Sequence, residues 1–67
     1  MTDSNNPYKI ELVANNDMTY YQVVRKRDDA ILYANPFVEN IALFVLSTDI
    51  YRRGVDAPTE LRNWRVF

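Results

Sequence analysis

The sequence predicts an α+β domain: a three- or four-stranded antiparallel sheet, in the chain order β-β-β-α-β, with one helix packed on one face. Two observations predict this class. Apolar and polar residues alternate over Tyr8–Ala14, which is the period of a half-buried strand. The stretch 36–53 is instead bounded by a helix start signal and a helix stop signal. We expect residues 1–6 to be a flexible N-terminal lead and residues 7–67 to form a single domain.

The first half of the chain supplies the expected strands. Asn15, Asn16 and Asp17 follow the first strand, and these residue types favour turns because they tolerate left-handed backbone and bond their own main chain. Residues 18–27 are dense in Tyr, Val and Thr, as a second strand would be. Asp28 and Asp29 then predict a two-residue turn into a third strand at residues 30–34.

These turns predict a pairing register and two sheet faces. Leu12 is expected opposite Tyr20, and Val24 opposite Tyr33, because residues that face each other across strands share a side. The expected core face is apolar and consists of Tyr8, Ile10, Leu12, Ala14, Met18, Tyr20, Val24, Ile31 and Tyr33. The opposite face is mixed, with basic and aromatic members, namely Lys9, Glu11, Val13, Thr19, Tyr21, Val23, Arg25, Arg27 and Leu32.

A single helix is expected after the third strand. Asn35 is a good N-cap and Pro36 suits the first helical position. Arg52 and Arg53 favour the negative end of the helix dipole, and Gly54 supplies a left-handed C-cap. The alternative is a buried strand through 41–47, since this apolar run also suits a strand.

The predicted helix is apolar on two opposite sides. At about 3.6 residues per turn, one side is the expected sheet contact and contains Phe37, Ile41, Phe44, Val45, Thr48 and Tyr51. The far side carries Leu43, Leu46 and Ile50, whose spacing resembles a short contact between helices. These three residues are the predicted dimer or partner interface. The alternative is that residues 61–67, which alternate loosely and offer a fourth strand, fold across the helix.

Composition narrows the class of protein. A chain of 67 residues buries only about 60% of its unfolded surface, and with no Cys and no His it has neither disulfides nor a usual zinc site to stabilise it. Oligomerisation is the remaining way to stabilise so short a chain. The net charge of −1 creates no general attraction to nucleic acid or anionic membranes. The longest apolar run, Ile41–Leu46, is far shorter than a membrane span, and the polar start of the chain favours a cytoplasmic protein.

Two basic and aromatic groups are second-rank candidates for a polar recognition surface. Tyr21, Arg25 and Arg27, with Lys9, could stack a base and hold phosphates, although a solvated face with cross-strand ion pairs is the simpler interpretation. Trp64 and Arg65 form the second group, and Trp and Arg are enriched in binding hot spots. The simpler interpretation of Trp64 is a core anchor.

The sequence therefore predicts a non-enzymatic interaction module, a small dimeric adaptor, modulator or inhibitor, that binds itself or another protein. The alternative is single-stranded nucleic-acid binding through the outer sheet face. Catalysis is not expected, because His and Cys are absent and the single glycine cannot form a phosphate-binding loop. No cofactor and no metal are expected.

Overall fold

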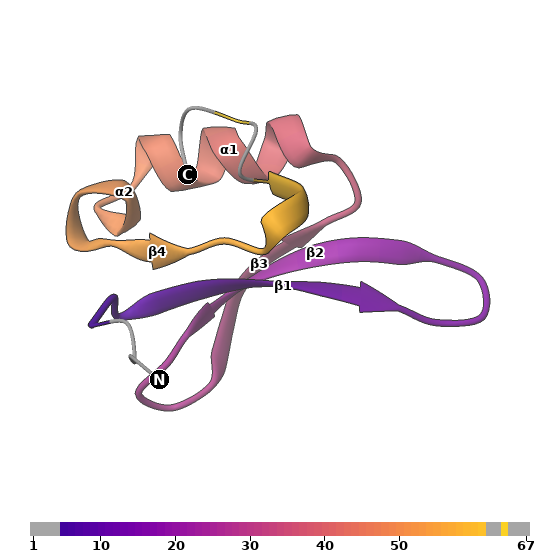
Figure 1. Ribbon diagram of the computed structural model, residues 1–67, viewed down its shortest axis with the longest axis horizontal. Coiled ribbons are helices and arrows are strands. Elements are labelled where there is room, and N and C mark those ends of the chain that lie inside the picture. Colours follow the sequence, from indigo (N-terminus) through magenta and orange to yellow (C-terminus); the bar gives the residue numbers. More distant parts are fainter. Residues whose placement is uncertain (1–4, 62–63, 65–67) are drawn as a thin grey trace.

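The structure is a computed structural model that describes residues 5–61 and residue 64. A sheet in the strand order β3-β2-β1-β4 carries helix α1 on one face, which confirms the α+β class (Figure 1). No helix among the described residues has the length and apolar character needed to cross a bilayer. The elements are β1 (Tyr8–Ala14), β2 (Thr19–Arg25), β3 (Ala30–Asn35), α1 (Val38–Ser47), α2 (Ile50–Arg53), β4 (Val55–Asp56) and the 3₁₀ turn η1 (Thr59–Leu61).

The fourth strand differs from the expected one in place and direction. β4 lies parallel to β1, with Tyr8 opposite Val55 and Lys9 opposite Asp56, so the sheet is mixed rather than wholly antiparallel. Helix α1 returns the chain to the end of the sheet where β3 began, and a strand that follows such a crossover runs parallel to its predecessor. Leu61, at the start of the segment expected to supply the strand, lies in η1.

The register of the first hairpin is shifted by one residue from the predicted one. Leu12 lies opposite Tyr21 rather than Tyr20. The cause is the turn, in which the backbone N–H of Asn15 donates to the carbonyl of Met18 at 2.9 Å. The Asn15 side-chain oxygen also accepts the N–H of Met18 at 3.1 Å, so the loop is one residue longer than expected. Because side chains alternate, this shift moves every β2 side chain to the other face.

The second hairpin is also longer than expected, and it contains a bulge. Residues 26–29 form the turn, and Asp29 has a positive φ of 58°. Val23 lies opposite Tyr33 while Val24 lies opposite Ile31, so the residue between Ile31 and Tyr33 is an extra one in β3. The predicted pairing of Val24 with Tyr33 is therefore wrong.

The predicted single helix is broken into two. Thr48 Oγ1 donates to the carbonyl of Phe44 at 2.9 Å and its ψ of 176° ends α1, after which α2 restarts at Ile50. Such a bond from a Thr side chain to a carbonyl one turn earlier competes with the helical backbone. The predicted stop is confirmed, since Gly54 has a φ of 111° and its N–H donates to the carbonyl of Ile50 at 2.9 Å.

The helix start is displaced as well. Asn35 is the last residue of β3, and its side-chain oxygen accepts the backbone N–H of Phe37 at 2.8 Å. This bond forms a turn before α1 rather than a cap on its first helical residues. Helix α1 therefore begins at Val38, and Pro36 lies in the connection.

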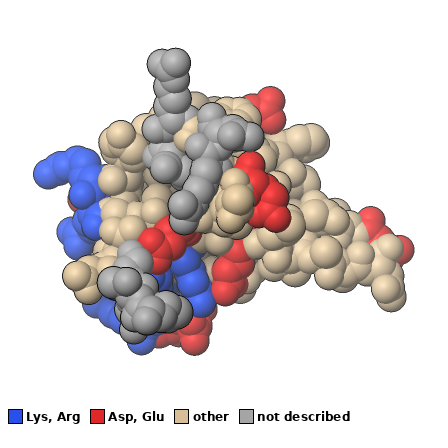
Figure 2. Space-filling model, in the orientation of Figure 1, with Lys and Arg blue, Asp and Glu red and all other residues tan. Residues whose placement is uncertain are grey.

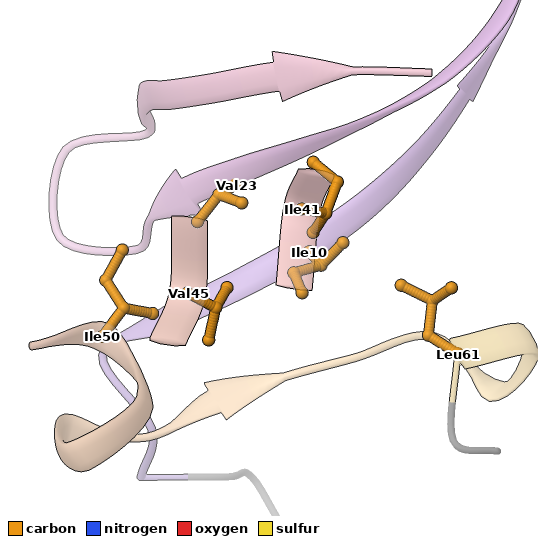
Figure 3. Packing of buried hydrophobic residues seen from close by; sticks show 6 residues of the cluster. All are labelled: Ile10, Val23, Ile41, Val45, Ile50 and Leu61. Carbon is orange, nitrogen blue, oxygen red and sulfur yellow. The ribbon is translucent and has the colours of Figure 1, made fainter. Parts of the chain in front are cut away.

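The core lies between the sheet and the two helices, where side chains from both layers meet (Figure 3). Ile41 and Val45 point from α1 toward the sheet and are 0% exposed, as predicted. A stacked ring pair, Tyr33 on β3 and Phe44 on α1 with centroids 4.6 Å apart, joins the layers at their edge. The buried cluster consists of Ile10, Val23, Ile41, Val45, Ile50 and Leu61.

Several predictions about the core are wrong. Leu12, Met18 and Ile31 were expected on the core face, but they are 41%, 54% and 60% exposed. Phe37 and Tyr51 were expected to face the sheet, but they are 61% and 50% exposed. Val23 was expected on the outer face, but it is fully buried beside Ile10 because of the shifted register. The later helix start and the break at Thr48 rotate the ends of the helical segment away from the positions of one continuous helix.

Candidate protein-interaction surfaces

The outer face of α1 is the first candidate surface. Leu43 is 63% exposed and Leu46 is 51% exposed, although both lie on the helix whose other side provides Ile41 and Val45 to the core. Their spacing of three residues places them as neighbours on the helix surface. We call Leu43 and Leu46 the outer leucine pair. Two large aliphatic side chains are thus presented together to solvent on a rigid element.

Ile50, the third residue of the predicted interface, lies elsewhere. It is only 4% exposed and belongs to the core cluster, so the prediction that it faces outward is wrong. The reason is the break at Thr48, because α2 restarts with its own orientation and directs Ile50 inward. The predicted three-residue row is therefore reduced to the outer leucine pair.

The predicted polar recognition surface is distributed over separate places. Tyr21 packs against the core cluster. Arg25 is on the same side of β2 as Tyr21, whereas Lys9 pairs with Val24 and so occupies the opposite sheet face. Arg27 is exposed in the turn between β2 and β3. The shifted register is what separates these residues.

The carboxyl end of the chain carries the other second-rank candidates. Trp64 is 39% exposed, and its backbone N–H donates to the carbonyl of Leu61 at 3.1 Å, which ties it to the end of η1. Arg65 lies outside the described residues. Trp64 is thus partly exposed, although its backbone is bonded to Leu61, which is itself in the core.

The end of the sheet where β1 begins is held by ion pairs. Arg25 donates to both carboxylate oxygens of Asp28, at 3.0 and 2.8 Å. This two-pronged hydrogen bond lowers the pKa of Asp28 to about 2, with a smaller contribution from the backbone N–H of Ala30. The guanidinium of Arg25 is therefore bonded within the β2–β3 turn.

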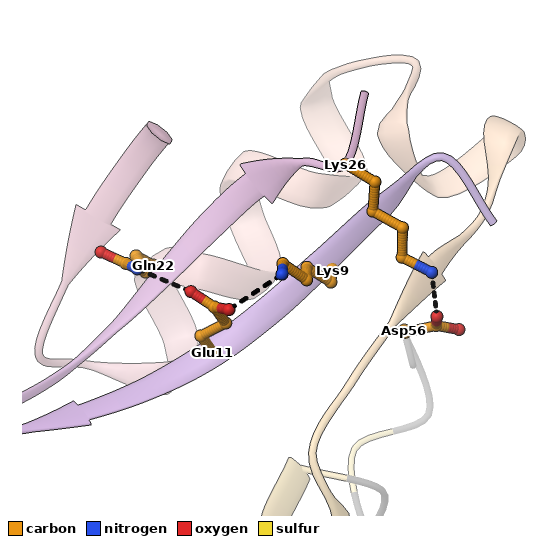
Figure 4. A network of polar contacts seen from close by, with 5 residues as sticks. All are labelled: Lys9, Glu11, Gln22, Lys26 and Asp56. Atoms are coloured by element: carbon orange, nitrogen blue, oxygen red, sulfur yellow. Dashed lines mark hydrogen bonds and ion pairs between the residues drawn. The ribbon is translucent and has the colours of Figure 1, made fainter. Parts of the chain in front are cut away.

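Two further groups of polar contacts are centred on Glu11 in β1 and on Asp56 in β4 (Figure 4). Glu11 accepts a hydrogen bond from Gln22 at 2.8 Å and pairs with Lys9 at 3.1 Å, and these bonds lower the pKa of the Glu11 carboxyl. Lys26 donates to Asp56 at 2.5 Å, which joins the β2–β3 turn to β4. The side chain of Asn6 donates to the same carboxylate at 2.8 Å. We call this region, residues 6–11 and 25–28 with Asp56, the anchored end.

The far end of the first hairpin projects beyond the rest of the sheet (Figure 1). We call residues 12–20 the arm. The sequence has no Lys or Arg between Ile10 and Val24. In Figure 2 the basic side chains accordingly gather over the opposite side of the molecule, and the projecting part is almost entirely uncharged. Leu12 and Met18, at 41% and 54% exposure, leave apolar surface on it.

A shallow groove of about 390 Å³ lies where the arm leaves β3. Sequence reasoning missed this groove, because it assigned Met18 and Tyr20 to the core and Pro36 to a helix. The chain turns away at Pro36 while β2 continues into the arm, and this divergence creates the groove. Its lining residues are Met18, Tyr20, Ala34, Asn35 and Pro36.

The described residues contain no group of three or more His, Cys, Asp or Glu side chains placed to hold a metal ion. Comparison of the chain with protein-family models, with curated proteins and with solved structures found no match. The surfaces that bear on function are therefore the outer leucine pair, the anchored end, and the arm with its groove.

Proposed function

We propose that this protein is a non-enzymatic, cytoplasmic interaction module that forms a homodimer through the outer face of α1. The observation that carries the proposal is the contrast across one helix: Leu43 and Leu46 are 63% and 51% exposed, while Ile41 and Val45 are 0% exposed. A helix in a small domain needs only one apolar side to pack on its sheet. Ile41 and Val45 already provide that side, so the outer leucine pair is additional apolar surface that the sheet does not cover.

A second copy of the chain is the most economical occupant. In a two-fold dimer the same patch lies on both partners, so the outer leucine pair of each copy meets that of the other. Burying a leucine side chain completely is worth about 1.5–3 kcal/mol. Because Ile50 is buried, the interface contains two of the three predicted residues of each copy and is smaller than the sequence predicted. The loss of translational and rotational freedom on association also costs at least about 4 kcal/mol of free energy. We therefore expect a weak, concentration-dependent dimer.

The test is the oligomeric state of wild type and of Leu46→Glu, measured by light scattering and sedimentation equilibrium across the micromolar range. Wild type is expected to dimerise as its concentration rises. Leu46→Glu is expected to stay monomeric with an unchanged circular dichroism spectrum, because Leu46 is half exposed and lies outside the core cluster.

The matched control is Ile31→Glu. Ile31 is 60% exposed, and it lies on β3 opposite Val24 rather than on the helix layer. This variant introduces the same charge in place of an aliphatic side chain of the same size, and it is expected to dimerise like wild type. A wild-type protein that remains monomeric at high micromolar concentration would contradict the dimer, as would equal dissociation by both variants.

Single-stranded nucleic-acid binding is supported less well. Arg25 is held by Asp28 and Tyr21 packs against the core, so neither is presented with Lys9 on one open face. The two functions differ in salt dependence. Binding through phosphates weakens steeply as salt rises and is reduced by Arg25→Ala, whereas an apolar helix contact is nearly independent of salt.

A further inference from the structure

We infer that the groove at the base of the arm binds an extended, apolar peptide segment flanked by basic residues, contributed by a partner protein. This site is distinct from the outer leucine pair, and it does not depend on dimerisation. With both surfaces, one copy of the chain could contact a second copy and a partner at the same time. Three features carry the inference: the free strand edge beside the groove, its apolar lining, and the acidic residues that adjoin the lining in the chain.

The free strand edge comes from the different lengths of β2 and β3. Asn35, the last residue of β3, lies opposite Tyr21, and β2 extends two further residues to Thr19. Among the described residues, Thr19 and Tyr20 are paired with β1 alone. Pro36 stands where β3 would have continued, and proline has no N–H to donate to a neighbouring strand. An added segment would continue the line of β3 beside the arm, which is a common mode of peptide recognition.

The lining of the groove favours apolar side chains. Met18 is 54% exposed, and Ala34 and Pro36 are exposed as well. The polar groups of Asn35 are already used within the protein: its oxygen accepts hydrogen bonds from Phe37 N and from Asn40, and its amide donates to Tyr33. The groove therefore lacks a free polar anchor from Asn35 for a small polar ligand, and it suits the alternating side chains of an extended peptide.

The charges around the groove determine the flanks of the peptide. Asp17 precedes Met18 at the tip of the arm, and Glu39 is in the first turn of α1, shortly after Pro36. Both are exposed, and neither has a basic group within ion-pair distance in the described part of the chain. The sequence has no Lys or Arg between Ile10 and Val24 or between Asp28 and Tyr51. Asp17 adjoins the lining residue Met18 in the chain, and Glu39 follows the lining residue Pro36 by three positions, so acidic residues lie next to both ends of the lining in the chain and complement a segment with Lys or Arg at its ends.

The test is a nuclear magnetic resonance titration of the full chain at low ionic strength with two capped peptides. Both have an alternating Val-Thr centre, one with paired Lys at each end and the other with paired Glu. The Lys peptide is expected to shift the backbone amides of Met18, Tyr20, Ala34 and Asn35. It should bind on the order of fivefold more tightly than the Glu peptide, because exposed charge pairs contribute about 0.2–1 kcal/mol each.

Two matched pairs of variants make the test specific. Ala34→Tyr fills the groove without adding charge and is expected to abolish binding, whereas Ile31→Tyr, on the same strand and sheet face outside the groove, is expected to bind normally. The double variant Asp17→Asn, Glu39→Gln is expected to bind both peptides equally.

The proposal is overturned by equal affinity of wild type for the two peptides, by shifts centred on other residues, or by no shifts at millimolar peptide. Concentration-dependent broadening of the Met18 and Ala34 amides without peptide would assign the groove to a second copy and would also overturn it. The outcome is independent of the dimer, since it is read at the groove residues and can be repeated with Leu46→Glu.

Discussion

The two ends of the first hairpin differ in the side chains that they contain: polar and ion-paired at the anchored end, and mostly uncharged in the arm. At the anchored end, Arg25 is bonded to Asp28, and Lys26 and Asn6 are both bonded to Asp56. In the arm, residues 12–20 contain one charged residue, Asp17, and take part in no ion pair with the described residues. The difference shows where the fold uses polar contacts to hold its own strands together and where it leaves apolar surface for another molecule.

The largest expected effect separates two residues on the same face of β1. Ile10 is 4% exposed and belongs to the core cluster, while Leu12, two residues further along, is 41% exposed. Ile10→Ala is expected to lower the free energy of unfolding by about 2–5 kcal/mol, enough to unfold much of so small a domain. Leu12→Ala is expected to lower it by about 1 kcal/mol. Urea unfolding of the two variants measures both, and equal losses would contradict the contrast between the ends.

The next largest loss of stability is expected from a substitution of Gly54, which lies against Asn6 of the anchored end. Its φ of 111° is unfavourable for side chains, and a Cβ added there would lie 2.2 Å from the side-chain oxygen of Asn6. Gly54→Ala is therefore expected to destabilise the fold by about 1–3 kcal/mol, again measured by urea unfolding.

A double-mutant cycle distinguishes the two causes of that loss. In the background of Asn6→Ala the overlap with the side chain is removed, so the added cost of Gly54→Ala is expected to fall, with the backbone contribution remaining. The same cost in both backgrounds would show that the close approach of Asn6 contributes nothing.

The smallest expected effect is on the acid titration of the Asp28 carboxyl, which belongs to the anchored end. The pKa of Asp28 is lowered from 3.8 to about 2 by its hydrogen bonds with Arg25. Because the carboxylate is favoured in the folded state, its contribution to stability is present above about pH 4 and is lost as the pH falls toward 2. A titration followed by nuclear magnetic resonance is expected to give a midpoint near 2 for Asp28 in wild type.

The matching variant is Arg25→Gln, in which the Asp28 midpoint is expected to return toward its ordinary value. A wild-type midpoint for Asp28 near its ordinary value of 3.8 would mean that the ion pair with Arg25 does not form in solution.

Much of the local structure was predictable from short-range signals. The alternation over Tyr8–Ala14 identified β1 with its bounds, and Arg52, Arg53 and Gly54 marked the end of the helical region. Two of the three predicted interface residues, Leu43 and Leu46, are exposed as expected. These features depend on the preferences of a few neighbouring residues, so the sequence is sufficient for them.

The sequence by itself thus determined the order of elements and the exposure of the outer leucine pair, whereas only the tertiary structure decided the faces of β2, the direction of β4 and the burial of Ile50. The physical reason is that Tyr and Val suit either face of a strand, so a one-residue shift leaves the local pattern equally good. The hydrogen bond from the Met18 N–H to the Asn15 side chain set the register of the first hairpin. The hydrogen bond from the Thr48 side chain to the Phe44 carbonyl ended α1, and the restart of the helix then directed Ile50 into the core.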